Sequence, residues 1–182
     1  MALTTKLYTA DDLWQMPGDE PWELWDGELL KVPGAGAEAS ETAGIIFVHL
    51  FPFVRAAKLG IVTTADGEYV LARDPDTVVV PDVGYVRWDR LPGGVRPRGH
   101  VPVPPDLAVE VRSPSDRAGG IAAKLNQYRR AQVPLVWWID PVRRTVAVYR
   151  YGELVGELRE GDALDGEDVL PGFRMPVATV FA

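Results

Sequence analysis

The chain has 182 residues, of which 47% are hydrophobic, so it is long and apolar enough for one domain with a substantial core. It contains no cysteine and only two histidines, which excludes disulfides, thiolate zinc sites and a cysteine nucleophile and argues against a histidine-rich zinc site. The net charge of −7 argues against a broadly basic nucleic-acid-binding surface, although arginines can still cluster locally. No apolar run approaches the roughly 20 residues that span a bilayer, and the first residues lack the apolar core of a signal peptide. We therefore expect a cytoplasmic protein with no membrane partner.

The first elements along the chain are a short helix and a hairpin. Residues 9–14 predict a helix with Thr9 as its N-cap. Residues 22–25 and 28–32 predict two strands, because Asp26-Gly27 between them is a strong hairpin signal. Glu23 lies inside the first of these strands; it could point at a site, although we expect it on the solvent side of an alternating pattern.

A long helix and several strands follow. Residues 40–59 predict a helix with Ser40 as its cap. Strands are predicted over residues 61–64 and 68–71 and then over 77–86, where Pro81 indicates an edge, a bend or a bulge. Asp82 follows this proline, so a carboxylate stands within an apolar strand. Residues 88–104 are rich in Gly, Pro and Arg and predict a surface loop.

The next strand, residues 107–112, is short, apolar and β-branched, as is typical of a strand covered on both faces. Glu110 lies in its middle. A charged side chain in a buried strand costs several kcal/mol unless it is paired or bound to a metal. The sequence therefore predicts a partner for Glu110.

A helix is predicted to begin after Ser113–Asp116, with Ile121, Leu125 and Tyr128 on its buried face. Lys124 falls on the same face and Gln127 borders it. The chain has only four lysines, and every other basic residue after Lys58 is an arginine. A lysine here indicates a role that arginine fills poorly; the alternative is a lysine that buries its stem and extends its charge into water.

The remaining chain predicts strands over residues 135–140, 145–150 and 153–158, with Trp137 and Trp138 packing in the core or against the sheet. Strands, a strand-to-helix crossover and more strands together favour one mixed α/β domain covering residues 1–182.

Asp82, Glu110 and Lys124 are the residues whose placement the fold alone does not explain. Two carboxylates from neighbouring strands can hold a divalent cation such as Mg²⁺, with the backbone carbonyl of Val111 as a further ligand. A nearby lysine can orient water or stabilise charge on a phosphoryl group. These are the parts needed to hydrolyse a phosphodiester.

Six segments, in this order, carry a resemblance to a known family: WELWDGEL at residues 22–29, PDVGYV at 81–86, PDLAVEVRSPSD at 105–116, KLNQY at 124–128, VPLVWWIDP at 133–141 and LPGF at 170–173. With them the chain resembles the Uma-two family of restriction endonucleases, a branch of the PD-(D/E)XK nuclease superfamily. The resemblance implies an α/β fold with a central mixed β-sheet flanked by helices, restriction-endonuclease-like, with an additional N-terminal hairpin. It also implies Mg²⁺ or Mn²⁺ as cofactor, with Asp82 and Glu110 as metal ligands.

The chain departs from the superfamily pattern at two places. The lysine that usually lies two residues after the acidic residue is replaced by Arg112, and the similar family moves this lysine to the position of Lys124. The family often has a histidine where this chain has Ala39, Ser40 and Glu41. Glu41 could replace it as a ligand, although a capping role is the simpler interpretation. Arg112 could bind substrate phosphate or form an internal salt bridge to Glu110 or Asp106.

Our leading hypothesis is a Mg²⁺- or Mn²⁺-dependent endonuclease that hydrolyses DNA, with catalytic Asp82, Glu110 and Lys124 and with Arg112 and Gln127 as substrate-binding residues. A homodimer would allow both DNA strands to be cut. Two alternatives remain at this stage: a catalytically inactive nuclease-like binding module, and a metal-dependent hydrolase of a small phosphorylated substrate. The salt dependence of substrate binding separates a DNA-binding protein from an enzyme for a small substrate, because DNA binding weakens steeply with salt.

Overall fold

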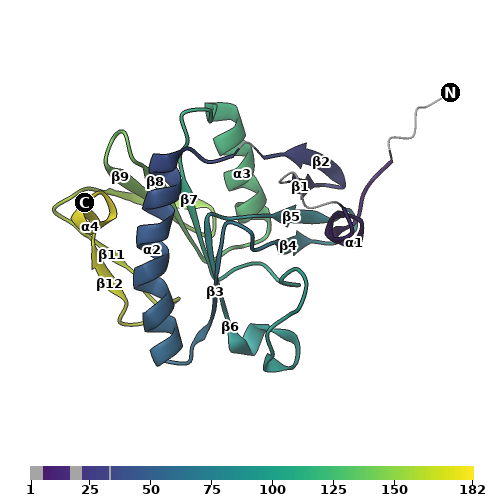
Figure 1. Ribbon diagram of the computed structural model, residues 1–182, viewed down its shortest axis with the longest axis horizontal. Helices are drawn as coiled ribbons and strands as arrows, with labels where there is room; N and C mark the ends of the chain where they lie inside the picture. Colours follow the sequence, from purple (N-terminus) through teal and green to yellow (C-terminus); the bar gives the residue numbers. More distant parts are fainter. Residues whose placement is uncertain (1–5, 17–21, 33) are drawn as a thin grey trace.

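The computed structural model describes residues 6–16, 22–32 and 34–182, and its centre is a six-stranded sheet in the order β10-β9-β8-β7-β6-β3 (Figure 1). Its strands are β3 (Gly60–Thr64), β6 (Val83–Arg87), β7 (Leu107–Val111), β8 (Leu135–Asp140), β9 (Thr145–Arg150) and β10 (Glu153–Leu158). Strands β7 and β8 are parallel and the other neighbours are antiparallel. The mixed sheet predicted from the sequence is confirmed.

A second sheet of four strands, in the order β2-β1-β5-β4, lies beside the first (Figure 1). It consists of β1 (Trp22–Trp25), β2 (Glu28–Lys31), β4 (Tyr69–Ala72) and β5 (Thr77–Val79). The predicted N-terminal hairpin is therefore present, but β1 also pairs with β5 through Leu24 and Val78. Strand β1 is an interior strand. A further small pair, β11 (Ala163–Asp165) and β12 (Arg174–Pro176), lies near the C-terminus.

The apolar stretch 77–86 is two strands in two different sheets, so the prediction of a single interrupted strand was wrong. Strand β5 ends at Val79 and β6 begins at Val83. Pro81 has no N–H for a ladder hydrogen bond, and the N–H of Val80 donates to the Glu23 side chain instead of to a strand. The chain leaves one sheet and enters the other here, and Asp82 stands at this crossing.

Four helices complete the fold: α1 (Ala10–Trp14), α2 (Ala37–Ala56), α3 (Ala118–Arg130) and α4 (Val177–Val180). Thr9 caps α1 as predicted, in a capping box with Asp12. Helix α2 begins before Ser40, with Gly36 as its N-cap. Helix α3 begins after Ser113–Asp116 as predicted, with Arg117 as its N-cap, and Asp116 accepts a hydrogen bond from the Ser113 amide in the preceding turn. The predicted loop after β6 contains two short 3₁₀ turns, η1 (Trp88–Arg90) and η2 (Pro92–Gly94).

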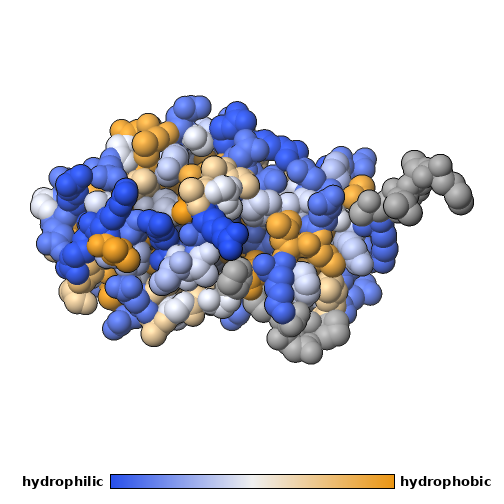
Figure 2. Space-filling view, turned by 90° about the horizontal axis from the view of Figure 1, so that it is seen from above, coloured by the Kyte–Doolittle hydropathy of each residue, from blue (hydrophilic) through white to orange (hydrophobic). Residues whose placement is uncertain are grey.

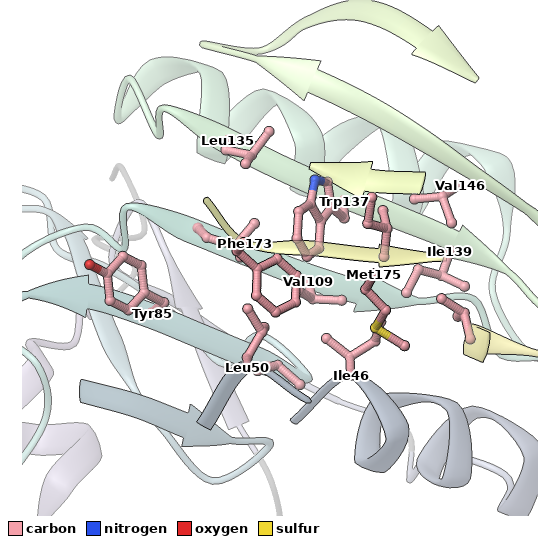
Figure 3. Close-up of a cluster of buried hydrophobic side chains, with 14 of the residues drawn as sticks. Ile46, Leu50, Tyr85, Val109, Leu135, Trp137, Ile139, Val146, Phe173 and Met175 are labelled. Atoms are coloured by element: carbon pink, nitrogen blue, oxygen red, sulfur yellow. The ribbon is translucent and has the colours of Figure 1, made fainter. Parts of the chain in front are cut away.

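The face of the central sheet that packs against α2 is apolar throughout (Figure 3). Side chains alternate across a strand, so Val109 of β7 and Trp137 of β8 point to this face, where they meet Ile46 and Leu50 of α2. All four side chains are fully buried. Burial of each such side chain stabilises the fold by about 1.5–3 kcal/mol.

The opposite face of the sheet packs against α3. Ala108 of β7, Val136 of β8 and Tyr128 of α3 are buried there in a second apolar cluster. The same alternation places Glu110 on this face, because it lies two residues after Ala108. On the surface seen from above, apolar patches are scattered among hydrophilic side chains (Figure 2).

Candidate active site

Glu110 is buried between β7 and α3, and it has the partners that the sequence analysis required. The residue is only 6% exposed. Its carboxylate lies 2.9 Å from Lys124 Nζ through Oε1 and 3.1 Å through Oε2. The Tyr128 hydroxyl donates a short hydrogen bond to Oε1. A lysine and a tyrosine four residues apart on α3 thus hold one carboxylate, as their shared helix face allows.

Lys124 points inward and makes three contacts with the sheets. Besides Glu110, its Nζ lies 2.8 Å from Oε1 of Glu23 and 3.3 Å from the carbonyl oxygen of Val80. The side chain is 14% exposed. The predicted inward position of Lys124 is confirmed. Its ammonium group is paired inside the protein and does not extend into water.

Glu23 was expected on the solvent side, and this expectation was wrong. It is 2% exposed, and it accepts hydrogen bonds of 2.9 Å from the Trp25 indole and from the Val80 amide. Both faces of β1 are covered, because the adjacent residues Glu23 and Leu24 point to opposite faces and both are buried. Nothing in the alternation of residues 22–25 indicates this burial. The one indication in the sequence was that Glu23 lies in WELW, part of a segment that carries the family resemblance.

Asp82 stands directly before β6 and faces the same pocket as Glu110. Its Oδ2 accepts a 2.7 Å hydrogen bond from the backbone N–H of Val111. This bond fixes the orientation of the Asp82 carboxylate against the end of β7. Val111 was predicted to offer its carbonyl to a cation, and the structure adds a second role for it through its amide.

Burial, together with repulsion from neighbouring carboxylates, raises the pKa values of the two predicted ligands. Burial raises the pKa of Glu110 to about 8; the Lys124 charge opposes this rise and the charges of Asp82 and Glu23 add to it. Burial also raises the pKa of Asp82, although the Val111 hydrogen bond and Lys124 oppose it. Burial alone would lower the pKa of Lys124, but Glu110 and Glu23 outweigh it and raise that pKa, so Lys124 remains an ammonium.

These side chains line a pocket of about 300 Å³, the lower end of the range for small-ligand sites. Its polar wall consists of Glu23, Asp82, Glu110 and Lys124, and Trp138 and Arg117 also contribute. Carboxylate oxygens are the donors that Mg²⁺ and Mn²⁺ prefer, so the donor set fits a hard divalent cation. No three His, Asp or Glu side chains within residues 6–16, 22–32 and 34–182 are grouped as a ready-made metal site.

The other predicted residues do not line this pocket. Arg112 pairs with Asp140 at 2.7 Å, so the predicted internal salt bridge exists but with a different partner. Gln127 is buried and accepts a hydrogen bond from Arg130. Asp106 bonds the Arg87 amide and the Arg90 side chain, in agreement with a structural role. Glu41 lines a separate depression.

The match to known proteins agrees with this geometry. Residues 10–178 match the Uma2 family, whose description is "putative restriction endonuclease". The chain belongs to the Uma2 family. The match covers the hairpin, both sheets and all three of the residues Asp82, Glu110 and Lys124, so the resemblance stated from the sequence is confirmed.

A solved structure has the same fold. It is the crystal structure of a putative nuclease belonging to DUF820 from Anabaena variabilis, and it aligns with a TM-score of 0.78 over 95% of this chain and 97% of that one. Only 17% of the aligned residues are identical, so this likeness establishes the restriction-endonuclease-like arrangement of the Uma2 chain and not its chemistry. No curated protein matches the sequence. Family and fold together support a nuclease.

None of the helices in the described parts of the chain is long and apolar enough to cross a membrane.

Proposed function

We propose that this Uma2 protein is a cytoplasmic endonuclease that hydrolyses DNA phosphodiester bonds with Mg²⁺ or Mn²⁺ as cofactor. The observation that carries the proposal is the buried contact between Lys124 Nζ and Glu110, beside Asp82 in one pocket. A buried lysine between carboxylates costs desolvation free energy that a purely structural pair of apolar residues would avoid. A catalytic role for Lys124 would explain why this desolvation free energy is tolerated.

Asp82 and Glu110 would hold the cation, with the Val111 carbonyl as a third oxygen. Such a cation lowers the pKa of bound water and neutralises charge on a phosphoryl group. Asp82 is oriented for this task by the Val111 amide. Glu110 must lose its proton to become a ligand, because burial raises its pKa to about 8.

Lys124 would supply positive charge to the phosphoryl group in the transition state. Its raised pKa keeps it protonated, so it acts as a hydrogen-bond donor and not as a general base. Glu23 holds the ammonium at 2.8 Å from the opposite side. When Glu110 binds a cation, Glu23 still balances and positions Lys124.

DNA as the substrate rests on the family and on the rim of the pocket. Arg117, which is exposed at the N-terminal end of α3, lines the pocket mouth and can contact phosphate. Arg112 and Gln127 are left out of this proposal, because their side chains bond Asp140 and Arg130. Two copies of the chain would allow both strands to be cut, so we include a homodimer as part of the proposal for double-strand cleavage.

A second candidate function is a nuclease-like module that binds without cutting. The observation that favours it is that both carboxylate oxygens of Glu110 already accept hydrogen bonds, from Lys124 and from Tyr128. A cation must displace Lys124 or Tyr128 from Glu110 before it can bind there.

Incubation of the protein with supercoiled plasmid separates these candidates. The nuclease predicts nicked or linear plasmid with Mg²⁺ or Mn²⁺, none in EDTA, and a rate that falls steeply as salt is raised. Sedimentation of the protein with and without DNA tests the dimer. If plasmid stays intact at low salt with either cation while still being retarded on a gel, the binding module is the correct function.

A further inference from the structure

A second, larger cavity lies away from the candidate active site. It has a volume of about 510 Å³ and is bounded by residues of α1, the C-terminal half of α2, β3 and the segment after η2. It shares no lining residue with the active-site pocket. Its volume lies within the range of small-molecule sites, about 300–1,000 Å³.

Two aromatic side chains in its wall are exposed. Trp14 at the end of α1 is 54% exposed, and Phe51 of α2 is 40% exposed. The rings of Trp14 and His100 are nearly perpendicular, with centroids 6.3 Å apart. Exposed aromatic faces in a cavity are suited to stacking against a flat ring, and each stacked base contributes about 1–3 kcal/mol in nucleic-acid-binding proteins.

Two polar atoms in the same wall lack partners. His100 Nε2 lies 3.3 Å from Arg73 Nη2, and because a guanidinium only donates, a neutral His100 carries its proton on Nδ1. This Nδ1 donor and the acceptor Oε2 of Glu68 are buried and have no hydrogen-bond partner among the described residues. Buried polar groups are ordinarily satisfied, so the wall holds one unused donor and one unused acceptor.

The cavity also contains cations without carboxylate partners. Arg55 and Arg96 line it, and neither forms an ion pair with any of the described residues. Asp66 and Glu68 also line the cavity, so its wall carries no large net positive charge and does not favour a highly charged anion. A monophosphate meets this condition better than a triphosphate does.

We propose that this cavity binds a guanine mononucleotide. The base would stack on Trp14, donate its N1–H and amino group to Glu68 and accept from His100 Nδ1, while Arg55 and Arg96 contact the phosphate. Guanine is the base whose hydrogen-bonding edge offers two adjacent donors to a carboxylate and a carbonyl acceptor beside them. Because Oε2 and Nδ1 are both buried in the wall, this binding mode requires the side chains of Glu68 and His100 to turn toward the cavity when the ligand enters.

Calorimetric titration of GMP into the protein in EDTA tests this site without relying on the nuclease activity. We expect binding by the wild type, weaker binding of AMP, and at least a tenfold loss of GMP affinity in Glu68→Gln and in Arg96→Ala. Glu153→Gln and Arg98→Ala are the matched controls, because both residues are exposed and lie outside the cavity. Lys124→Gln, which disables the proposed active site, leaves GMP binding unchanged.

A short single-stranded oligonucleotide with one guanine identifies the source of the nucleotide. If it binds more tightly than GMP and the Glu68 variant loses this advantage, the cavity receives a base from a nucleic acid strand. If GMP binds more tightly, the cavity is a site for the free nucleotide. Absence of GMP binding at millimolar concentration, or equal binding of GMP and AMP that Glu68→Gln does not change, overturns the proposal.

Discussion

The two faces of strand β7 differ in what they do for the molecule. Toward α2 the strand presents Leu107, Val109 and Val111, which all enter the main apolar core. Toward α3 it presents Ala108 and then Glu110, which enters a cluster of charged groups. One five-residue strand therefore serves the core on one face and the candidate site on the other.

The apolar face of β7 helps the fold to tolerate the buried carboxylate of Glu110 on the other face. The apolar face supplies burial that fixes β7 between β6 and β8. This rigid frame holds Glu110, Lys124 and Glu23 within hydrogen-bonding distance, so their desolvation is partly offset by pairing. Changes on the apolar face should therefore alter stability, and changes on the polar face should alter chemistry.

The largest expected effect is on stability and comes from the apolar face. Trp137→Ala removes a fully buried side chain that stacks near Phe173, and should lower the free energy of unfolding by about 3–5 kcal/mol. Urea unfolding followed by circular dichroism measures this loss. Trp14→Ala, at an exposed tryptophan, is the control and should cost far less. Equal losses in both variants would contradict the division between the faces.

Lys124→Gln should give the largest loss of activity. Removal of one charged group that stabilises a transition state lowers the rate by about 10²–10³-fold. The fold should persist, because Glu110 can take up a proton and Glu23 keeps its hydrogen bonds from Trp25 and Val80. Plasmid cleavage measures the rate.

Lys58→Gln removes the same charge at an exposed position and is the control for that experiment. Wild-type cleavage by Lys124→Gln would sink the proposed mechanism.

The fold and the placement of Asp82, Glu110 and Lys124 around one pocket could be predicted from the sequence, because their signals are local. Asp26-Gly27 specifies a turn, the β7 residues specify a buried strand, and the face of α3 specifies which way Lys124 points. The burial of Glu23 could not be predicted, because it depends on contacts with Val80 and Lys124, which are distant in the chain. The split of residues 77–86 between two sheets is likewise a tertiary feature that no local pattern contains.

Glu110→Gln should change how stability depends on pH. The pKa of Glu110 is raised to about 8 from its usual 4.5. Between these values the folded state binds more protons than the unfolded state, so this residue makes stability fall as pH rises. The slope from one such group is at most about 1.4 kcal/mol per pH unit.

Thermal unfolding in EDTA from pH 5 to pH 8 tests this prediction. The wild type should lose stability across the range, and Glu110→Gln should lose less. Parallel curves for the two proteins would show that the proton on Glu110 does not contribute.

The smallest expected effect is that of Glu23→Gln. This substitution keeps the shape of the side chain but removes one counter-charge from Lys124, so cleavage should fall by about tenfold as the ammonium becomes less well positioned. Glu28→Gln, at an exposed position in the same hairpin, is the matched control. If both variants cleave plasmid at the wild-type rate, Glu23 does not position Lys124 during catalysis.

Calorimetric titration of Mn²⁺ at pH 8 into the wild type, Asp82→Asn and Asp11→Asn tests the central claim most directly, since it requires no knowledge of the substrate. Asp11 is an exposed aspartate of α1 and serves as the control. We expect the wild type and Asp11→Asn to bind Mn²⁺ at the same site and Asp82→Asn not to bind it. Undiminished binding by Asp82→Asn, or no binding by the wild type, would contradict a metal site at Asp82 and Glu110.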